Sequence, residues 1–174
     1  FQKTSGGFSN ATELIAFIKE KKFDFSIGAG CYPEKHPESL SMEDEISFLK
    51  KKVDAGAEFL ITQLFFSNTV FEKFCEMTSR ANIKIPIIPG IMPITDFKQI
   101  DRFKKMAGCH IPEDYLSRLE KVKDNQTEFL KISMEYTINQ CRSLIKSQVK
   151  GLHFYTLNQS RACFEIVKSL ESDL

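Results

Sequence analysis

Polar side chains that could bind a ligand follow the first predicted strand, in the segment Tyr32-Pro33-Glu34-Lys35-His36-Pro37-Glu38. Proline fixes its own φ angle and restricts the residue before it, so this loop should hold Tyr32 and His36 in set directions. A phenol and an imidazole in such a loop could both hydrogen-bond a ligand. The two prolines could also simply mark a rigid turn, and His36 could equally be a satisfied surface group.

Other polar residues lie where later strands and helices place them. Gln63 ends an apolar strand, and its carboxamide suits a heterocycle with an amide edge or a bond to a neighbouring strand end. Tyr155 lies at the exit of the last predicted strand, where its hydroxyl could meet a ligand. Gln99 and Phe103 are four apart on one helical face, although a phenylalanine on an apolar stripe is more often core.

A predicted helix from Met42 to Ala55 carries a mixed face that includes two lysines. This face consists of Glu45, Phe48, Lys51 and Lys52. The lysines could hold a phosphate, or the face could simply be solvated. No Ser/His/Asp arrangement, carboxylate pair or metal-ligand spacing is visible, because the 3 histidines are well separated. We therefore expect no metal site.

The elements that must position these residues begin with a helix from Asn10 to about Lys21, where Asn10 and Glu13 form a capping pair. Four short apolar strands follow, and each leads into one or more helices. The strands are expected at residues 25–30, 59–63, 85–88 and 152–156. Helices are expected at residues 41–56, 67 onward, 96–108, 112–122, 125–147 and 160–170.

Short, unalternating apolar strands are typical of a parallel sheet buried on both faces, so the fold class is α/β. The order allows a doubly wound sheet or part of a (β/α)₈ barrel. A complete barrel needs about 250 residues, so 174 residues favour a part with about four β/α units. Gly28-Ala29-Gly30 lacks the third glycine of a dinucleotide-binding fingerprint.

The composition is that of an ordinary soluble domain, with 42% apolar and 27% charged residues and a net charge of +1. We expect neither a nucleic-acid partner, which needs a basic excess, nor a membrane span. The 5 cysteines are scattered and form no CxxC pair, which indicates a reducing compartment, the cytoplasm. The chain starts at Phe1 without a methionine, which we interpret as an internal start.

Several of these segments together resemble the methylenetetrahydrofolate reductase family, in order and spacing, from about Gly6 to Leu170. The resembling segments are 32–38, 61–66, 87–93 and 152–158, with Lys52-Val53-Asp54-Ala55-Gly56-Ala57 between them. The resemblance implies a (β/α)₈ TIM barrel carrying FAD. Such an enzyme passes a hydride from NAD(P)H to the flavin and then to methylenetetrahydrofolate, giving methyltetrahydrofolate for methionine biosynthesis. Residues 1–174 would then form the C-terminal half of the catalytic barrel, within an enzyme expected to be a homo-oligomer.

The resemblance also implies roles for individual residues. It implies cofactor contacts from Tyr32, His36, Ser39, Glu45, Phe48, Lys51 and Lys52. It implies contacts to folate or to the nicotinamide nucleotide from Gln63, Gln99, Phe103, Tyr155 and Gln159. Two positions depart from the family, which usually has Asp at Glu45 and Arg at Gln159. Losing that guanidinium weakens the expectation of a salt bridge to the folate glutamate tail.

The catalytic acid of the family lies on the first barrel strand, so we expect none in this chain and less than full activity from it alone. Two other interpretations stay open. The chain could be a non-catalytic half-barrel that acts as a structural, self-associating module, because a half-barrel leaves strand edges and an apolar face open. It could also belong to a different barrel enzyme with a phosphate ligand.

Overall fold

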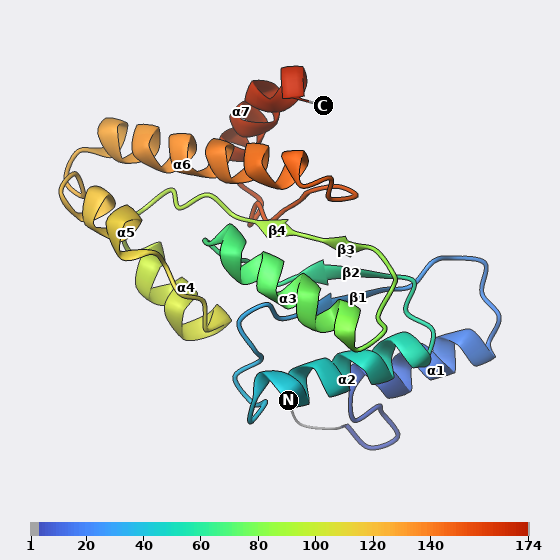
Figure 1. The fold of residues 1–174 in the computed structure, drawn as a ribbon. Coiled ribbons are helices and arrows are strands. Elements are labelled where there is room, and N and C mark those ends of the chain that lie inside the picture. The colour runs from blue at the N-terminus through green and yellow to red at the C-terminus, as the bar shows by residue number, and fades with distance from the viewer. Residues whose placement is uncertain (1–3, 174) are drawn as a thin grey trace.

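In the computed structural model, residues 4–173 are described, without the side chains of residues 106 and 107. A first helix is followed by short strands that alternate with helices (Figure 1). The elements are α1 (Ala11–Glu20), β1 (Gly28–Cys31), α2 (Met42–Asp54), β2 (Phe59–Thr62), α3 (Asn68–Arg80), β3 (Ile87–Ile88), β4 (Gly90–Ile91), α4 (Gln99–Ala107), α5 (Glu113–Glu120), α6 (Gln126–Lys146), β5 (His153–Phe154), α7 (Ser160–Leu170) and a final 3₁₀ turn, η1 (Glu171–Asp173).

The strands are parallel throughout, which confirms the predicted α/β class. β1, β2 and β3 pair in that order, and β4 pairs with β5. The third predicted strand, at residues 85–88, is observed as β3, and a further strand that was not predicted, β4, follows Pro89, which has no N–H to donate. The Pro89 carbonyl still accepts from His153 N–H at 2.9 Å, so the chain changes its pairing partner from β2 to β5 at this residue.

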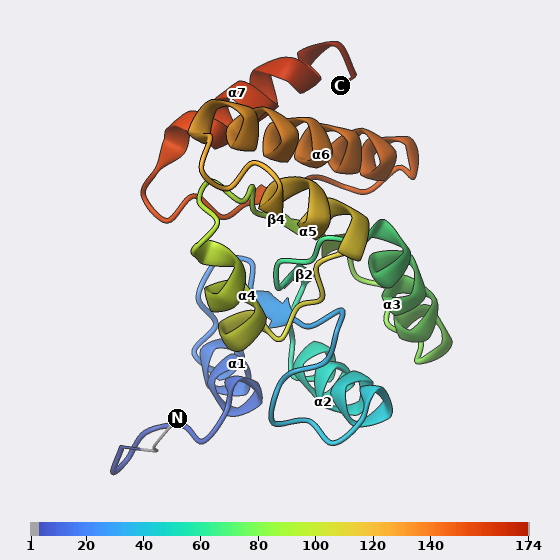
Figure 2. The ribbon, with the colours of Figure 1, turned by 90° about the vertical axis from the view of Figure 1, so that its left-hand side faces the viewer.

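The helices surround the strands rather than forming a separate layer. Figure 2 shows α2, α3 and α6 following one another around the outside of the strands, with α7 beyond α6. Their apolar faces fill three neighbouring cores. One, under α1, α2 and β2, includes Leu49 and Leu60; a second includes Tyr115 and Phe129; a third, under α6 and α7, includes Leu144 and Ile166. This packing fixes the carboxyl ends of the strands, where the ligand site is expected.

Local capping signals mark the starts of α1, α2 and α6. Asn10, Ser41 and Asn125 accept from the backbone N–H three residues on, as capping pairs do. The helix expected to start at Asp96 instead begins at Gln99, since the Asp96 carboxylate accepts from Lys98 N–H at 2.7 Å and closes a turn first. Within the described residues, no helix is long and apolar enough to cross a membrane.

Gly90 makes room for a bond that crosses β4. The Tyr155 hydroxyl, from the end of β5, donates to the Thr62 carbonyl at the end of β2 at 2.8 Å. A β-carbon on Gly90 would lie 2.7 Å from the Tyr155 ring and 2.3 Å from that carbonyl oxygen. The Thr62 hydroxyl accepts from Gly90 N–H at 2.8 Å, so all three strands meet here. Only glycine fits this crossing.

We expect alkylation of the native chain to be slow and confined to Cys75. The other four thiols are buried, whereas Cys75 is half-buried. Burial raises the pKa of Cys75 to about 11 and that of Cys109 and Cys141 to about 12, so thiolate is scarce at neutral pH. Iodoacetamide treatment followed by peptide mass mapping checks this, with Cys75→Ser as the unlabelled control. Label on Cys31 of the folded chain would contradict the expectation.

Candidate functional site

A cleft at the carboxyl end of β1 brings together every residue for which a cofactor contact was expected. Its volume is about 570 Å³. It lies between the loop after β1, the outer face of α2 and the first turn of α1. The lining residues are Asn10, Ala11, Thr12, Glu13, Tyr32, His36, Glu38, Ser39, Glu45, Phe48, Lys51 and Lys52. The first turn of α1 was not expected at this site. It precedes β1 in the chain, and no residue of it indicated ligand binding in the sequence.

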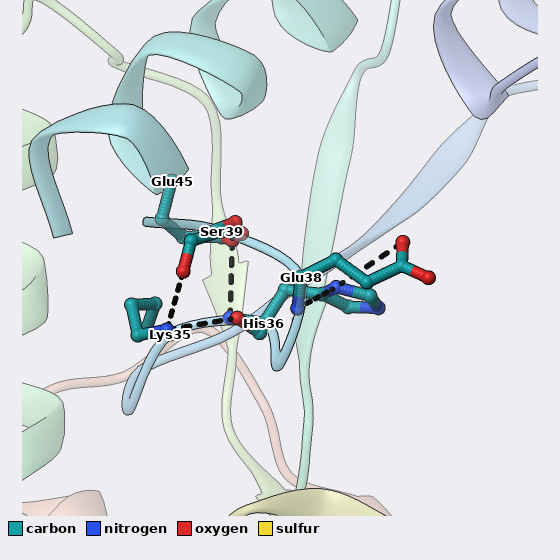
Figure 3. A network of polar contacts seen from close by, with 5 residues as sticks. All are labelled: Lys35, His36, Glu38, Ser39 and Glu45. Carbon is teal, nitrogen blue, oxygen red and sulfur yellow. Dashed lines mark hydrogen bonds and ion pairs between the residues drawn. The ribbon is translucent and has the colours of Figure 1, made fainter. Parts of the chain in front are cut away.

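Glu45 of α2 connects the loop after β1 to this helix through hydrogen bonds. Its side chain is only 2% exposed, and its Oε2 accepts from His36 N–H at 3.1 Å and from the Ser39 hydroxyl at 2.8 Å (Figure 3). The Lys35 ammonium donates to the Ser39 carbonyl, closing the loop from the other direction. Lys35 has a φ of 76°, a value that residues with a β-carbon rarely adopt. These hydrogen bonds therefore hold a strained turn. Glu45 therefore shapes the cleft more than it faces it.

His36 is held in one tautomer by the same loop. Its Nδ1 accepts from Glu38 N–H at 3.1 Å, so in the neutral imidazole the proton lies on Nε2. The ring meets Tyr32 edge to face, with the ring centroids 4.6 Å apart. Burial, with a smaller contribution from the Glu45 carboxylate, raises the pKa of Tyr32 above 10.0. At neutral pH the loop thus offers a ligand an imidazole N–H and a phenol O–H.

The two lysines of α2 have different surroundings. Lys52 donates to the Gly30 carbonyl at 2.9 Å and lies 5.9 Å from the centroid of the Tyr32 ring. Lys51 lies over the Phe48 ring at 4.9 Å and forms no ion pair with any described carboxylate. Phe48 is 53% exposed, so its ring and the ammonium over it are both accessible to a ligand. A ring joined to a phosphate would match this pair.

Gly30 leaves one side of the strand end open. A β-carbon built on it would meet no atom of the described residues within 4 Å, apart from those of its two chain neighbours. Side chains two residues apart on a strand point to the same face, so this open side is the side of Tyr32, which follows directly after the strand. A flat group could therefore approach the backbone closely here.

Removing the Glu45 carboxylate should loosen the cleft. We expect Glu45→Ala to lower the free energy of unfolding by about 1–3 kcal/mol, because the His36 amide and the Ser39 hydroxyl lose their buried acceptor. Glu45→Gln, which keeps an acceptor oxygen, should lose less. Urea unfolding followed by far-UV circular dichroism measures both, with exposed Glu43→Ala in the same helical turn as control. A Glu45→Ala variant as stable as the control would refute this role.

The residues expected to bind substrate are only partly brought together. A second cleft, of about 290 Å³, includes Gln99, Tyr155 and Gln159. The Gln99 carboxamide is largely engaged, since its Oε1 accepts from Thr95 N–H at 2.8 Å and its Nε2 donates to the Thr95 hydroxyl at 3.0 Å. Tyr155 donates its hydroxyl proton to Thr62, and Gln159 is exposed at the start of α7. Of these three side chains, Gln159 is the most exposed to solvent.

Gln63 and Phe103 lie outside this second cleft. The Gln63 Oε1 accepts from Leu64 N–H at 3.0 Å, which leaves its amide nitrogen without a partner among the described residues. Phe103 is 4% exposed and packs with Phe66 at a centroid separation of 6.3 Å. In this conformation Phe103 belongs to the core and presents no ring face to a ligand. The stacking role suggested for it stays a prediction that needs α4 to move.

Glu34, within the same loop, makes a contact that inspection of the sequence did not reveal. Its Oε2 accepts from His110 N–H at 2.8 Å, across 76 positions of sequence. Its other oxygen, Oε1, is buried without a described partner. Burial raises the pKa of Glu34 above 4.5 despite the hydrogen bond from His110. No local pattern predicts a bond of this separation. Among the described residues, no cluster of histidine, cysteine and carboxylate side chains could hold a metal ion.

Fold and cleft together define an α/β protein with a ligand-sized cleft at the carboxyl end of its parallel strands, where this architecture places its sites. The family model described as methylenetetrahydrofolate reductase matches residues 1–171. The chain therefore belongs to the methylenetetrahydrofolate reductase family.

Individual relatives agree with this assignment. A probable methylenetetrahydrofolate reductase (NADPH) of Caenorhabditis elegans is 40% identical over 162 residues, which cover 92% of this chain and 24% of the relative. Methylenetetrahydrofolate reductase (NADH) 1 of Arabidopsis thaliana is 33% identical, covering 98% and 30%. The 5,10-methylenetetrahydrofolate reductase of Buchnera aphidicola is 38% identical, covering 90% and 53%. The chain thus spans between a quarter and about half of the length of these relatives.

A solved structure shares the fold. It is that of an uncharacterized protein from Clostridium thermocellum that binds two copies of 5-methyl-5,6,7,8-tetrahydrofolic acid. The TM-score is 0.64 at 17% sequence identity, and the match covers 94% of this chain and 59% of the other. At this identity the similarity concerns the arrangement of strands and helices alone.

Proposed function

We propose that residues 1–174 are the C-terminal half of the catalytic (β/α)₈ barrel of a methylenetetrahydrofolate reductase, and that the first cleft holds FAD. The observation that carries this proposal is the gathering of all the expected cofactor contacts, from Tyr32 to Lys52, in one cleft. The proposed reaction reduces methylenetetrahydrofolate to methyltetrahydrofolate with NADH or NADPH. Relatives carry both names, so the choice of nucleotide stays open. FAD, when bound, would supply hydride transfer between reductant and substrate.

The donor set of the cleft fits the adenosine and pyrophosphate side of FAD. Phe48 supplies an exposed ring, and Lys51 an ammonium without an ion pair to a described carboxylate. Lys52 is fixed against the end of β1 with donors to spare. His36 offers Nε2–H, and Tyr32 a protonated hydroxyl. The carboxylates of Glu13 and Glu38 also line the cleft, so the attraction for phosphate is local to the lysines rather than general.

A flavin titration tests the proposal on the chain itself. The fluorescence of FAD, which is excited in the visible where protein side chains do not absorb, reports its binding directly. We expect saturable quenching of FAD and no competition from simple sugar phosphates, which separates this proposal from a barrel enzyme with a phosphate ligand. A folded chain that leaves FAD fluorescence unchanged would overturn the assignment of this cleft. The longer protein should be yellow and oxidise NAD(P)H only with methylenetetrahydrofolate.

We assign the second cleft to the folate, with Gln159 and Tyr155 at its edge and Gln99 on its wall. Gln63, with a free amide nitrogen, is proposed to meet the pterin ring. Because Gln159 is neutral, it would bond the glutamate tail of folate without a salt bridge. We place the whole enzyme in the cytoplasm as a homo-oligomer.

A second candidate function rests on the open sides of the molecule. Within residues 4–173, β1 pairs with β2 alone and β5 with β4 alone. Phe23 and Phe25 beside β1, and Phe164 on α7, are each more than half exposed, at 57%, 55% and 63%. Such surfaces favour a self-associating module without catalysis. Light scattering of the purified chain tests this alternative, and a clean monomer would exclude it.

A further inference from the structure

Glu34 links the loop of the first cleft to a distant segment of the chain. The residues on either side of it, Tyr32 and His36, line the cleft, whereas Glu34 does not. It reaches instead to the connection between α4 and α5, where its Oε2 accepts from His110 N–H at 2.8 Å. Pro37 of the same loop lies beside Gly108 in that connection, about 4.0 Å from the position of an added β-carbon.

The segment that Glu34 holds is anchored in the core. Gly108 ends α4 in the left-handed conformation, with a φ of 62°. Cys109 and Ile111 follow at 4% and 1% exposure, and they pack with Ile100 and Phe103 of α4. A displacement of this connection therefore moves α4, the helix that carries Gln99 into the second cleft.

The Glu34 carboxylate lies in surroundings that are unfavourable for a buried polar group. One of its oxygens is buried without a described partner, which costs free energy rather than contributing it. This cost indicates that the role of Glu34 is to hold the α4–α5 connection in place rather than to stabilise the fold.

We propose that Glu34 is a positioning residue that couples the two clefts, so that a flavin bound against Tyr32 and His36 also restrains the α4–α5 connection. The inference rests on the proposed function, because it takes FAD as the occupant of the first cleft. The coupling depends on a Glu34 side chain long enough to reach the His110 amide and accept its hydrogen bond. It does not depend on the charge of the carboxylate.

Two conservative variants separate length from charge. Glu34→Gln keeps the reach and an acceptor oxygen but loses the charge, and Glu34→Asp keeps the charge but is one methylene shorter. Glu120→Asp, on the exposed face of α5, is the matched control. Each chain is saturated with FAD, as read by flavin fluorescence, and amide hydrogen exchange of residues 108–111 is measured by mass spectrometry with and without FAD.

In the unmodified chain, in Glu34→Gln and in Glu120→Asp, we expect FAD to slow exchange in this segment about fivefold, the factor that corresponds to one hydrogen bond. In Glu34→Asp the slowing should vanish, and by linkage the Kd for FAD should rise by about the same factor. Equal slowing in Glu34→Asp and the unmodified chain at saturating FAD would overturn the coupling while leaving the flavin site intact. Failure of the unmodified chain to bind FAD would instead overturn the proposed function, and the coupling with it.

Discussion

Replacing Gly90 by alanine should lower the free energy of unfolding by about 1–3 kcal/mol, the usual cost of forcing a methyl group into a filled space. The added β-carbon would lie 2.3 Å from the Thr62 carbonyl oxygen and 2.7 Å from the Tyr155 ring. The carbonyl belongs to the backbone of β2 and cannot turn away. Either the Tyr155 bond to Thr62 breaks or β4 moves away from β2. For a chain of this length, a midpoint lower by about 2–4 °C per kcal/mol is expected.

Gly30→Ala is the matched control, since its β-carbon meets nothing within 4 Å. Its stability should stay within about 0.5 kcal/mol of the unmodified chain. Urea unfolding followed by far-UV circular dichroism compares the two alanine variants directly. The double variant Gly90→Ala with Tyr155→Ala should lose less stability than the sum of the two single losses, because one of the two clashes is gone. If Gly90→Ala is as stable as Gly30→Ala, then the crossing of β2, β4 and β5 has room for a methyl group.

Gly30→Val should weaken FAD binding by about tenfold or more, equivalent to about 1.4 kcal/mol. The valine side chain would occupy the open side of the strand end, next to Tyr32, where the proposed flavin approaches. Because no described residue other than the two chain neighbours of Gly30 lies within 4 Å of the added β-carbon, the fold itself should tolerate the change. Loss of binding would then reflect exclusion of the ligand and not unfolding.

Flavin fluorescence titration measures this effect, and circular dichroism confirms that the variant is folded. Gly30→Ala should show a smaller loss, since a methyl group fills less of the space than an isopropyl group. If Gly30→Val binds FAD as tightly as the unmodified chain, then the flavin does not lie against the end of β1, and the ligand of this cleft must be sought among smaller molecules.

Elements with strong local signals could be predicted from the sequence. Asn10 caps the first helix as its spacing from Glu13 indicates, and in the structure Ser41 and Asn125 likewise accept from the backbone N–H three residues on. The strands are short and apolar, and they lie near where their composition suggested. The Asp96 helix start was misplaced because an aspartate can close a turn as readily as it caps a helix.

The cleft was predictable only through resemblance to the family. The residues alone left a solvated face of α2 and a plain proline turn as open alternatives. What no pattern indicated were contacts set by the tertiary arrangement. Glu45 turns inward to hold His36 and Ser39, and Glu34 reaches His110, although both carboxylates look alike in the sequence. The side to which a carboxylate turns depends on neighbours far away in the chain.

The bonds that shape the loop after β1 have a consequence for the order of folding. They join residues only 4, 6 and 9 positions apart, which are Lys35 with Ser39, Ser39 with Glu45, and His36 with Glu45. The Tyr155 bond to Thr62, by contrast, spans 93 positions. Closing a short loop costs little chain entropy, so contacts of low sequence separation form readily and early. During synthesis these local bonds of the loop should therefore form well before β5 leaves the ribosome and pairs with β4.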